Sequence, residues 1–174
     1  MTWTAPEVTR TRAPRVADER TALEGWLGFH RQTLLHKCTG LTSDQLKTAS
    51  VEPSNLTLLG LVRHMAEVER WWFRTCFAGE TLPDLYNTDE YQDGDFDLVA
   101  DADAESDLAT FVVECDLADR TAAGRSLDDT FPSPRSPELR MDLRWIYVHM
   151  IEEYARHNGH ADLIRQRIDG ATGE

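Results

Sequence analysis

The chain has 174 residues, of which 41% are hydrophobic, and a formal net charge of −13 from 31 acidic and 18 basic residues. This length suits one domain with its own core, and this composition excludes a disordered chain. The acidity disfavours nucleic-acid and membrane-surface partners, and no apolar run approaches the roughly 20 residues of a membrane span. The polar start of the chain lacks the apolar core of a signal peptide. We therefore expect one cytoplasmic domain over residues 1–174, with residues 1–16 as an N-terminal arm.

The first predicted helix begins after Asp18, a suitable N-cap, runs to about Lys37, and is ended by Gly40. Its apolar face is formed by Leu23, Trp26, Leu27, His30 and Leu34. A short helical turn is expected near residues 42–46.

The second predicted helix is capped by Thr57 or Ser54 and ends at Gly79. Its buried stripe comprises Leu58, Leu61, Val62, Met65, Val68 and Trp72. Residues 81–103 are acidic and rich in turn-forming residues, and we expect a long ordered loop there. A loop of this length in a compact domain is often functional.

A third helix is predicted over residues 104–124, with an apolar face of Leu108, Phe111, Val112 and Cys115. Prolines make residues 131–137 a break that we expect to be extended. The fourth helix begins at about Glu138 or Asp142 and ends near Ile168. Its seam has alternating steps of four and three residues: Leu143, Tyr147, Met150, Tyr154, His157, Ala161, Ile164 and Ile168. Four amphipathic helices with long connecting loops predict an all-α fold, a four-helix bundle.

The three cysteines, Cys38, Cys76 and Cys115, lie far apart in the sequence. Their spacing forms no CxxC motif for zinc or redox chemistry. We interpret them as small core residues of a protein in a reducing compartment.

Two helices carry a candidate metal site. His157 occupies a seam position that an ordinary core would give to leucine, and Glu153 lies one turn earlier on nearly the same face. A buried glutamate is costly unless it is paired or binds a metal, and imidazole with carboxylate suits a divalent ion such as Zn or Ni. His64 is the best third ligand, because ligands in a helix bundle converge from facing helices. Such a set leaves coordination positions for water or substrate.

Each of these residues also has a plainer interpretation. A Glu–His pair at this spacing occurs by chance as a hydrogen bond, and a histidine on an apolar face is commonly a core residue. His149 and His160 are rival ligands and the candidate catalytic residues, which would handle protons or orient a ligand by a hydrogen bond. His30 is a weaker rival that we interpret as a core residue.

Arg63, Arg144 and Arg156 are the candidates for binding a cofactor, because a guanidinium can hold a carboxylate through two hydrogen bonds. The alternative for each is pairing with the many acidic residues of the surface. Trp71, Trp72 and Trp145 are interpreted as core residues or as the wall of a substrate slot.

Two segments resemble motifs of the DinB-like family. Residues 58–70, LLGLVRHMAEVER, resemble its second-helix motif, and residues 145–160, WIYVHMIEEYARHNGH, resemble its last-helix motif. The commoner last-helix motif has histidine at both metal positions, whereas Glu153 takes the first position here. The set of His64, Glu153 and His157 is similar to that of the actinobacterial branch that includes the N-terminal domain of mycothiol-dependent maleylpyruvate isomerase, where it holds zinc.

The resemblance implies a function as well as a fold. DinB-like relatives include S-transferases that use bacillithiol or mycothiol. We therefore expect a metal-dependent mycothiol S-transferase, in which a metal-bound thiolate attacks a small electrophile. A metal-dependent hydrolase or isomerase that uses metal-bound water and a non-catalytic metal-binding stress-response module stay open as alternatives. The resemblance also admits a homodimer, for which the sequence shows no interface.

Overall fold

The computed structural model describes residues 2–172 and is mainly helical, with one small sheet. The helices are α1 (Glu19–Cys38), α2 (Ser43–Leu46), α3 (Leu58–Glu69), η1 (Arg70–Phe77), α4 (Gly94–Asp97), α5 (Ala104–Ala122) and α6 (Leu143–Asp169). Strands β1 (Thr130–Pro132) and β2 (Arg140–Asp142) pair in antiparallel fashion. Met1 of the predicted arm and residues 173–174 of the predicted domain lie outside the described residues. The predicted predominance of helix is confirmed, and no helix within residues 2–172 is long and apolar enough to cross a membrane.

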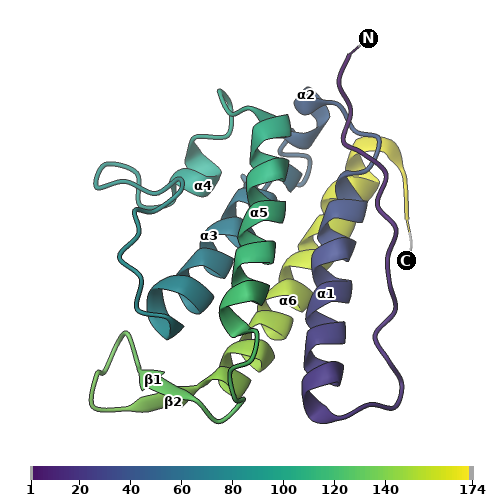
Figure 1. The fold of residues 1–174 in the computed structure, drawn as a ribbon. Helices are drawn as coiled ribbons and strands as arrows, with labels where there is room; N and C mark the ends of the chain where they lie inside the picture. The colour runs from purple at the N-terminus through teal and green to yellow at the C-terminus, as the bar shows by residue number, and fades with distance from the viewer. Residues whose placement is uncertain (1, 173–174) are drawn as a thin grey trace.

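The long helices form two packed pairs. α1 packs mainly against α6, and α3 packs mainly against α5. In Figure 1, α1 and α6 run upward whereas α3 and α5 run downward. α3 also contacts α6, and this contact joins the two pairs.

Side-chain caps set where the helices begin. The predicted caps Asp18 and Thr57 are confirmed, because each accepts a hydrogen bond from a backbone N–H of the first turn. Asp142 caps α6 in the same way through the N–H of Trp145. The alternative start of α6 at Glu138 was wrong, because that residue lies in the loop that joins β1 to β2.

Three local features differ from the expected elements. The second predicted helix is α3 followed without a break by η1, a π-helix. The expected long loop of residues 81–103 contains the short helix α4. The expected extended break becomes a paired hairpin, in which Phe131 lies opposite Met141.

The core lies where the predicted apolar faces meet. Along α6 the predicted seam is buried, except at His157 and Ile168, which are half-buried. Trp26 and Val112 were predicted on apolar faces but are 48% and 44% exposed, because the buried stripes of α1 and α5 are narrower than the sequence pattern suggested. The largest fully buried side chains include Tyr147, Tyr154, Phe73 and Phe111.

The ion pair between Arg31 and Glu69 is buried in this core. The carboxylate of Glu69 accepts two hydrogen bonds of 2.7 Å from the guanidinium of Arg31, and a third of 2.7 Å from the hydroxyl of Tyr154. Arg31 also donates to Asp119, at 2.7 Å. Residues of α1, α3, α5 and α6 therefore meet in one polar network.

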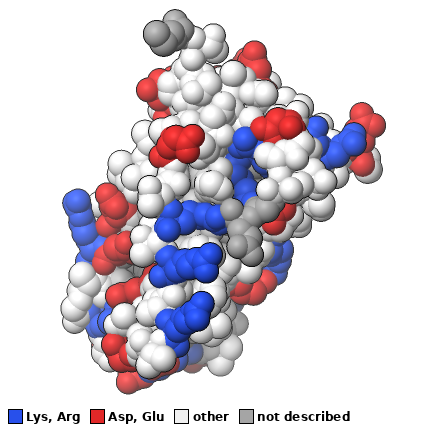
Figure 2. Space-filling model, turned by 90° about the vertical axis from the view of Figure 1, so that its right-hand side faces the viewer, with Lys and Arg blue, Asp and Glu red and all other residues white. Residues whose placement is uncertain are grey.

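The N-terminal arm runs along α1. Its start is held by an isolated bridge between Thr4 and Thr42, beside which the N–H of Ala5 donates to the carbonyl of Leu41 at 2.9 Å. Figure 2 views the side of the molecule along which the arm runs, and shows Lys and Arg side chains gathered in a column on it. The column is therefore a basic strip on a face that also carries Asp and Glu side chains.

Candidate metal centre

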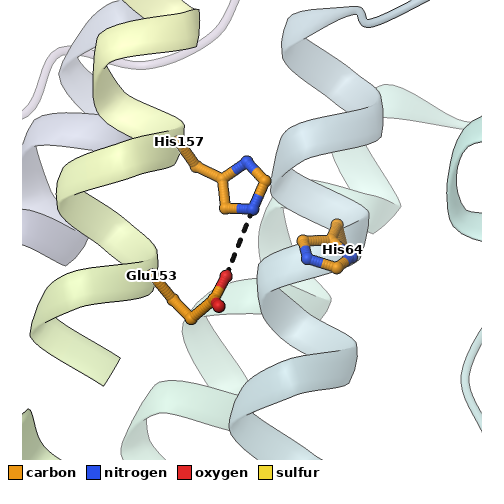
Figure 3. Close-up of side chains that lie close together, drawn as sticks. All are labelled: His64, Glu153 and His157. Atoms are coloured by element: carbon orange, nitrogen blue, oxygen red, sulfur yellow. Dashed lines mark ion pairs between the residues drawn. The ribbon is translucent and has the colours of Figure 1, made fainter. Parts of the chain in front are cut away.

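The contact between α3 and α6 brings three metal-ligating side chains together. His64 projects from α3, and Glu153 and His157 project from successive turns of α6 (Figure 3). One ligand atom from each lies within 4.8 Å of the others. His157 Nε2 is 3.4 Å from Glu153 Oε2, and the rings of His64 and His157 are 4.9 Å apart between centroids. These are the three residues that the sequence selected as a set.

The cluster is partly open to solvent. The side chains of His64, Glu153 and His157 are 25%, 16% and 12% exposed. Partial exposure lets a small molecule reach the ligand atoms, while burial of most of each side chain limits its freedom to move away. This combination is typical of a site that exchanges ligands and unlike that of a closed structural site.

A buried carboxylate orients His64. Asp95 is 3% exposed, and its Oδ2 lies 2.8 Å from His64 Nδ1. An ionised carboxylate only accepts hydrogen bonds, so Nδ1 is the protonated nitrogen and Nε2 keeps its lone pair. A carboxylate behind a histidine in this way fixes the tautomer that binds a metal and raises its basicity.

Sequence reasoning did not select Asp95. Its one signal was its place in the acidic loop of residues 81–103, which we expected to be ordered and of a length that is often functional. That loop offers several carboxylates, and nothing in their spacing distinguishes the one that reaches His64.

Two glycines allow close packing around α4, one within the acidic loop and one between α3 and α4. A Cβ atom on Gly94 would overlap the carbonyl oxygen of Tyr86. A Cβ atom on Gly60, in α3, would lie 2.8 Å from the ring of Phe96. The Phe96 ring in turn lies 5.2 Å from that of His64 between centroids. Gly94 therefore lets the loop fold closely on itself, and Gly60 leaves room for the Phe96 ring between α4 and α3.

Arg63, on α3, binds the backbone of the same loop. Its guanidinium is buried and donates at 3.0 Å to the carbonyls of Gly94 and Asp95 and to the carboxylate of Asp107. It also lies 4.0 Å from the ring centroid of Tyr86. These contacts make Arg63 an anchor of the loop, and its predicted role in cofactor binding stays a prediction.

The other two candidate arginines lie in different places. Arg144 pairs with Glu19 and Asp128 near the start of α6, about 13 Å along the helix axis from Glu153 at 1.5 Å per residue. Arg156 is bonded to Glu152, and its Nη1 lies 3.3 Å from Glu153 Oε1. We call His64, Glu153 and His157 the metal cluster, meaning the group of three candidate ligand side chains. Arg156 is the candidate arginine that contacts this group, through Glu153.

Both candidate catalytic histidines are neighbours of the cluster. His160 Nδ1 lies 3.4 Å from His157 Nδ1. His149 stacks on Trp145, with ring centroids 4.7 Å apart, and shares a second group of ligand atoms with Glu152 and Glu153. Trp72 packs against both of these rings, so an aromatic surface adjoins the cluster.

Burial favours the neutral form of two histidines, His157 and His149. Burial, and next the neighbouring His64, lower the pKa of His157 to about 4. Burial also lowers the pKa of His149. A neutral imidazole is the form that donates a lone pair to a metal. Two imidazole nitrogens and one carboxylate oxygen thus fit a divalent transition metal with open coordination positions.

The described cysteines are all free thiols, and none belongs to the metal cluster. Burial raises the pKa of Cys38 to about 12 and that of Cys76 to about 11. Burial also raises the pKa of Cys115. A thiol with a raised pKa is a poor nucleophile at neutral pH, because the thiolate is the reactive form.

Comparison with known families gives a match that covers most of the chain. The sequence model of the mycothiol-S-transferase family, which is DinB-like, matches residues 22–170. The match covers most of the chain and includes every residue of the metal cluster. No curated protein and no solved structure gives a significant match. The finer resemblance to the N-terminal domain of mycothiol-dependent maleylpyruvate isomerase has no support from these comparisons.

Proposed function

The chain belongs to the mycothiol-S-transferase family, and from this premise we propose that it is a metal-dependent enzyme that joins mycothiol to small electrophiles. Family membership supports the thiol. Metal dependence is supported by one observation, the convergence of His64, Glu153 and His157 with His64 oriented by the buried Asp95. A four-helix bundle of the DinB-like type and a homodimer are parts of the same proposal.

The protein supplies the ligands and their orientation. A divalent metal, Zn or Ni, held by His64, Glu153 and His157 would act as a Lewis acid that lowers the pKa of a coordinated thiol. Asp95 keeps His64 in the tautomer whose Nε2 is free. His160 faces the far nitrogen of His157 and is placed to orient that ring.

The attacking sulfur comes from the thiol substrate. The chain's own cysteines are outside the cluster and have raised pKa values, so they are unsuited to the role. In the overall reaction the thiol loses its proton, a carbon–sulfur bond forms, and the leaving group departs with its bonding electrons. We assign proton acceptance to His149, which lies one turn before Glu153 and is partly exposed.

The rim of the cluster offers contacts for both substrates. The rings of Trp72, Trp145 and His149 pack together, with Trp145 stacked on His149 and Trp72 edge-on to His149, and Trp145 is 41% exposed. An apolar electrophile would pack on this surface. Arg156 is the candidate to donate hydrogen bonds to the bound thiol.

The test combines metal content with turnover. We expect about one Zn or Ni per chain by elemental mass spectrometry, and conjugation of mycothiol to 1-chloro-2,4-dinitrobenzene with release of chloride. His157→Ala should lose both the metal and the conjugation, because it removes one of three ligands. His36→Gln, which changes a histidine outside the ligand groups, should keep both.

Three outcomes would overturn the proposal. Protein that takes up neither Zn nor Ni would exclude metal dependence. Turnover of a substrate without any thiol would indicate a hydrolase or isomerase instead. Metal binding without conjugation of any electrophile tested would favour a non-catalytic module.

A further inference from the structure

A second feature, separate from the metal cluster, lies under the N-terminal arm. A hollow of about 1130 Å³ is bounded by the arm and by side chains of α1 and α6. Its charged and aromatic lining includes Arg10, Arg12, Arg15, Trp26, Phe29 and Lys37. No residue of the metal cluster lines it.

The hollow is part of the fold because the arm is fastened along its length. At one end the N–H of Gly40 donates to the carbonyl of Ala5 at 2.9 Å. In the middle the N–H of Thr11 donates to Gln32 Oε1 at 2.6 Å. At the other end Pro14 packs so closely on α1 that a Cβ atom at Gly25 would lie 2.5 Å from its Cδ. The arm therefore forms a strap over one face of α1.

The charge of the lining is opposite to that of the chain. The net charge is −13, yet the hollow gathers Arg10, Arg12 and Arg15 from one short segment of the arm. Within residues 2–172, no carboxylate lies within ion-pair distance of these three guanidinium groups. Asp162, an acidic residue of the lining, is already paired with Lys37 at 2.6 Å. The column of basic side chains in Figure 2 lies on the side of the molecule along which the arm runs.

The wall of the hollow is aromatic. Trp26 is 48% exposed, and its ring meets that of Phe29 edge-to-face at 6.2 Å between centroids. The guanidinium of Arg10 lies 5.6 Å from the Phe29 ring centroid. An exposed indole beside unpaired guanidinium groups offers an apolar surface and a positive charge to the same ligand.

We propose that this hollow binds a small organic anion with a planar apolar body. The anionic oxygens would accept hydrogen bonds from Arg12 and Arg15, and the body would pack on Trp26. The charge selects anions, and the indole selects those with an aromatic part. The site does not depend on the metal cluster, so it can exist whether or not the proposed transferase activity does.

The probe is 8-anilinonaphthalene-1-sulfonate, whose fluorescence rises in an apolar site. We expect saturable binding that weakens with salt, because the contact is charge-assisted. Arg12→Gln with Arg15→Gln should weaken it by about tenfold or more, from the loss of two charge-assisted contacts. Arg120→Gln, an exposed arginine of α5 outside the lining, is the matched control and should leave it unchanged.

Two further measurements make the test specific, one with a neutral probe and one with a variant of the metal cluster. The neutral N-phenyl-1-naphthylamine should bind more weakly than the sulfonate and be insensitive to the arginine variants, whereas Trp26→Ala should weaken both probes. His157→Ala should bind the sulfonate like the wild type. Displacement by 1-naphthoate or by 1-naphthyl phosphate would support the site and identify the preferred anionic group.

The proposal is overturned if the double arginine variant binds the sulfonate as tightly as the wild type. It is also overturned if the neutral probe binds equally well, or if neither naphthyl anion displaces the sulfonate. Circular dichroism of each variant checks the fold, which we expect to persist because Arg12 and Arg15 are exposed.

Discussion

Asp95 is buried with its carboxylate against His64, and it is the residue on which the orientation of the proposed metal ligand depends. The carboxylate also accepts a hydrogen bond from the backbone of Phe96, so it is held in place by its own turn. Without this partner, His64 would be free to protonate either nitrogen and to rotate. The metal site therefore extends one residue beyond its three ligands.

Asp95→Asn should lower the affinity for zinc by about 10- to 100-fold, because it removes the negative charge behind His64 and keeps the shape of the side chain. Competition with a chromophoric chelator measures the affinity. Asp97→Asn is the control, since Asp97 is in the same short helix but is exposed. Equal affinity in the two variants would show that Asp95 does not support the ligand.

Cys76 gives a prediction about pH. Burial raises its pKa from 9.0 to about 11, so below pH 9 its thiolate fraction is about 100-fold smaller than that of an ordinary cysteine. Carbamidomethylation of Cys76 by iodoacetamide should be at least about 100-fold slower in the native chain than in guanidinium at pH 8. Its rate should rise with pH towards a midpoint near the raised pKa. A native midpoint near 8 would contradict the burial effect.

At the scale of elements, Glu69 joins the helices. It is the last residue of α3, at the point where η1 begins, and it is fully buried. Its partners, Arg31 and Tyr154, come from α1 and α6. A buried carboxylate with three hydrogen bonds fixes the angles between these elements, whereas apolar contacts alone tolerate sliding.

Glu69→Ala should lower the free energy of unfolding by about 3–5 kcal/mol, because it leaves the guanidinium of Arg31 buried without this partner. Urea unfolding followed by circular dichroism measures the change. The control is Glu152→Ala, which removes an exposed partner of Arg156 and should cost about 1 kcal/mol or less. A similar decrease in the free energy of unfolding for both variants would mean that the buried ion pair stabilises the fold no more than an exposed one.

The elements that differed from expectation share one cause. The apolar pattern of residues 58–77 predicts a helix but not the π-helical hydrogen bonding of η1, which depends on how its side chains meet α5 and β1. Prolines predicted the break at residues 131–137, but pairing of β1 with β2 is a contact between segments that local preference does not encode. Local periodicity was therefore enough to predict that a helix exists. The π-helical hydrogen bonding of η1 and the pairing of β1 with β2 depend on segments that are distant in the sequence.

For the whole molecule, a metal at this cluster would link α3 to α6 and so join the two packed helix pairs. A ligand that binds only the folded chain raises its stability by mass action. Removal of the metal abolishes this gain in the free energy of unfolding. The size of the gain measures how fully the metal occupies the site.

Zinc at 100 times its dissociation constant should raise the free energy of unfolding by about 2.7 kcal/mol over the protein in chelator. Thermal and urea unfolding with zinc and with EDTA measure the difference. His157→Ala should show no difference between the two conditions, because it lacks one of the three ligands. An equal zinc effect in the variant would place the metal elsewhere on the chain.

The sequence by itself determined the long helices α1, α3, α5 and α6, two of their caps and most of the buried seam of α6, because these depend on residues within a few positions of one another. It also selected His64, Glu153 and His157, since helical spacing places the last two on one face and family motifs carry all three. Their role as metal ligands stays a prediction.

Only the tertiary structure decided that Asp95 supports His64, that Arg63 anchors the acidic loop, and that the arm encloses a basic hollow. Asp95 is 31 residues from His64, and Gly60 leaves room for the Phe96 ring beside α3 where the acidic loop reaches the site. The arm likewise meets α1 through contacts such as that of Thr11 with Gln32. Contacts of this range depend on the path of the backbone through space, which no local pattern of residues specifies.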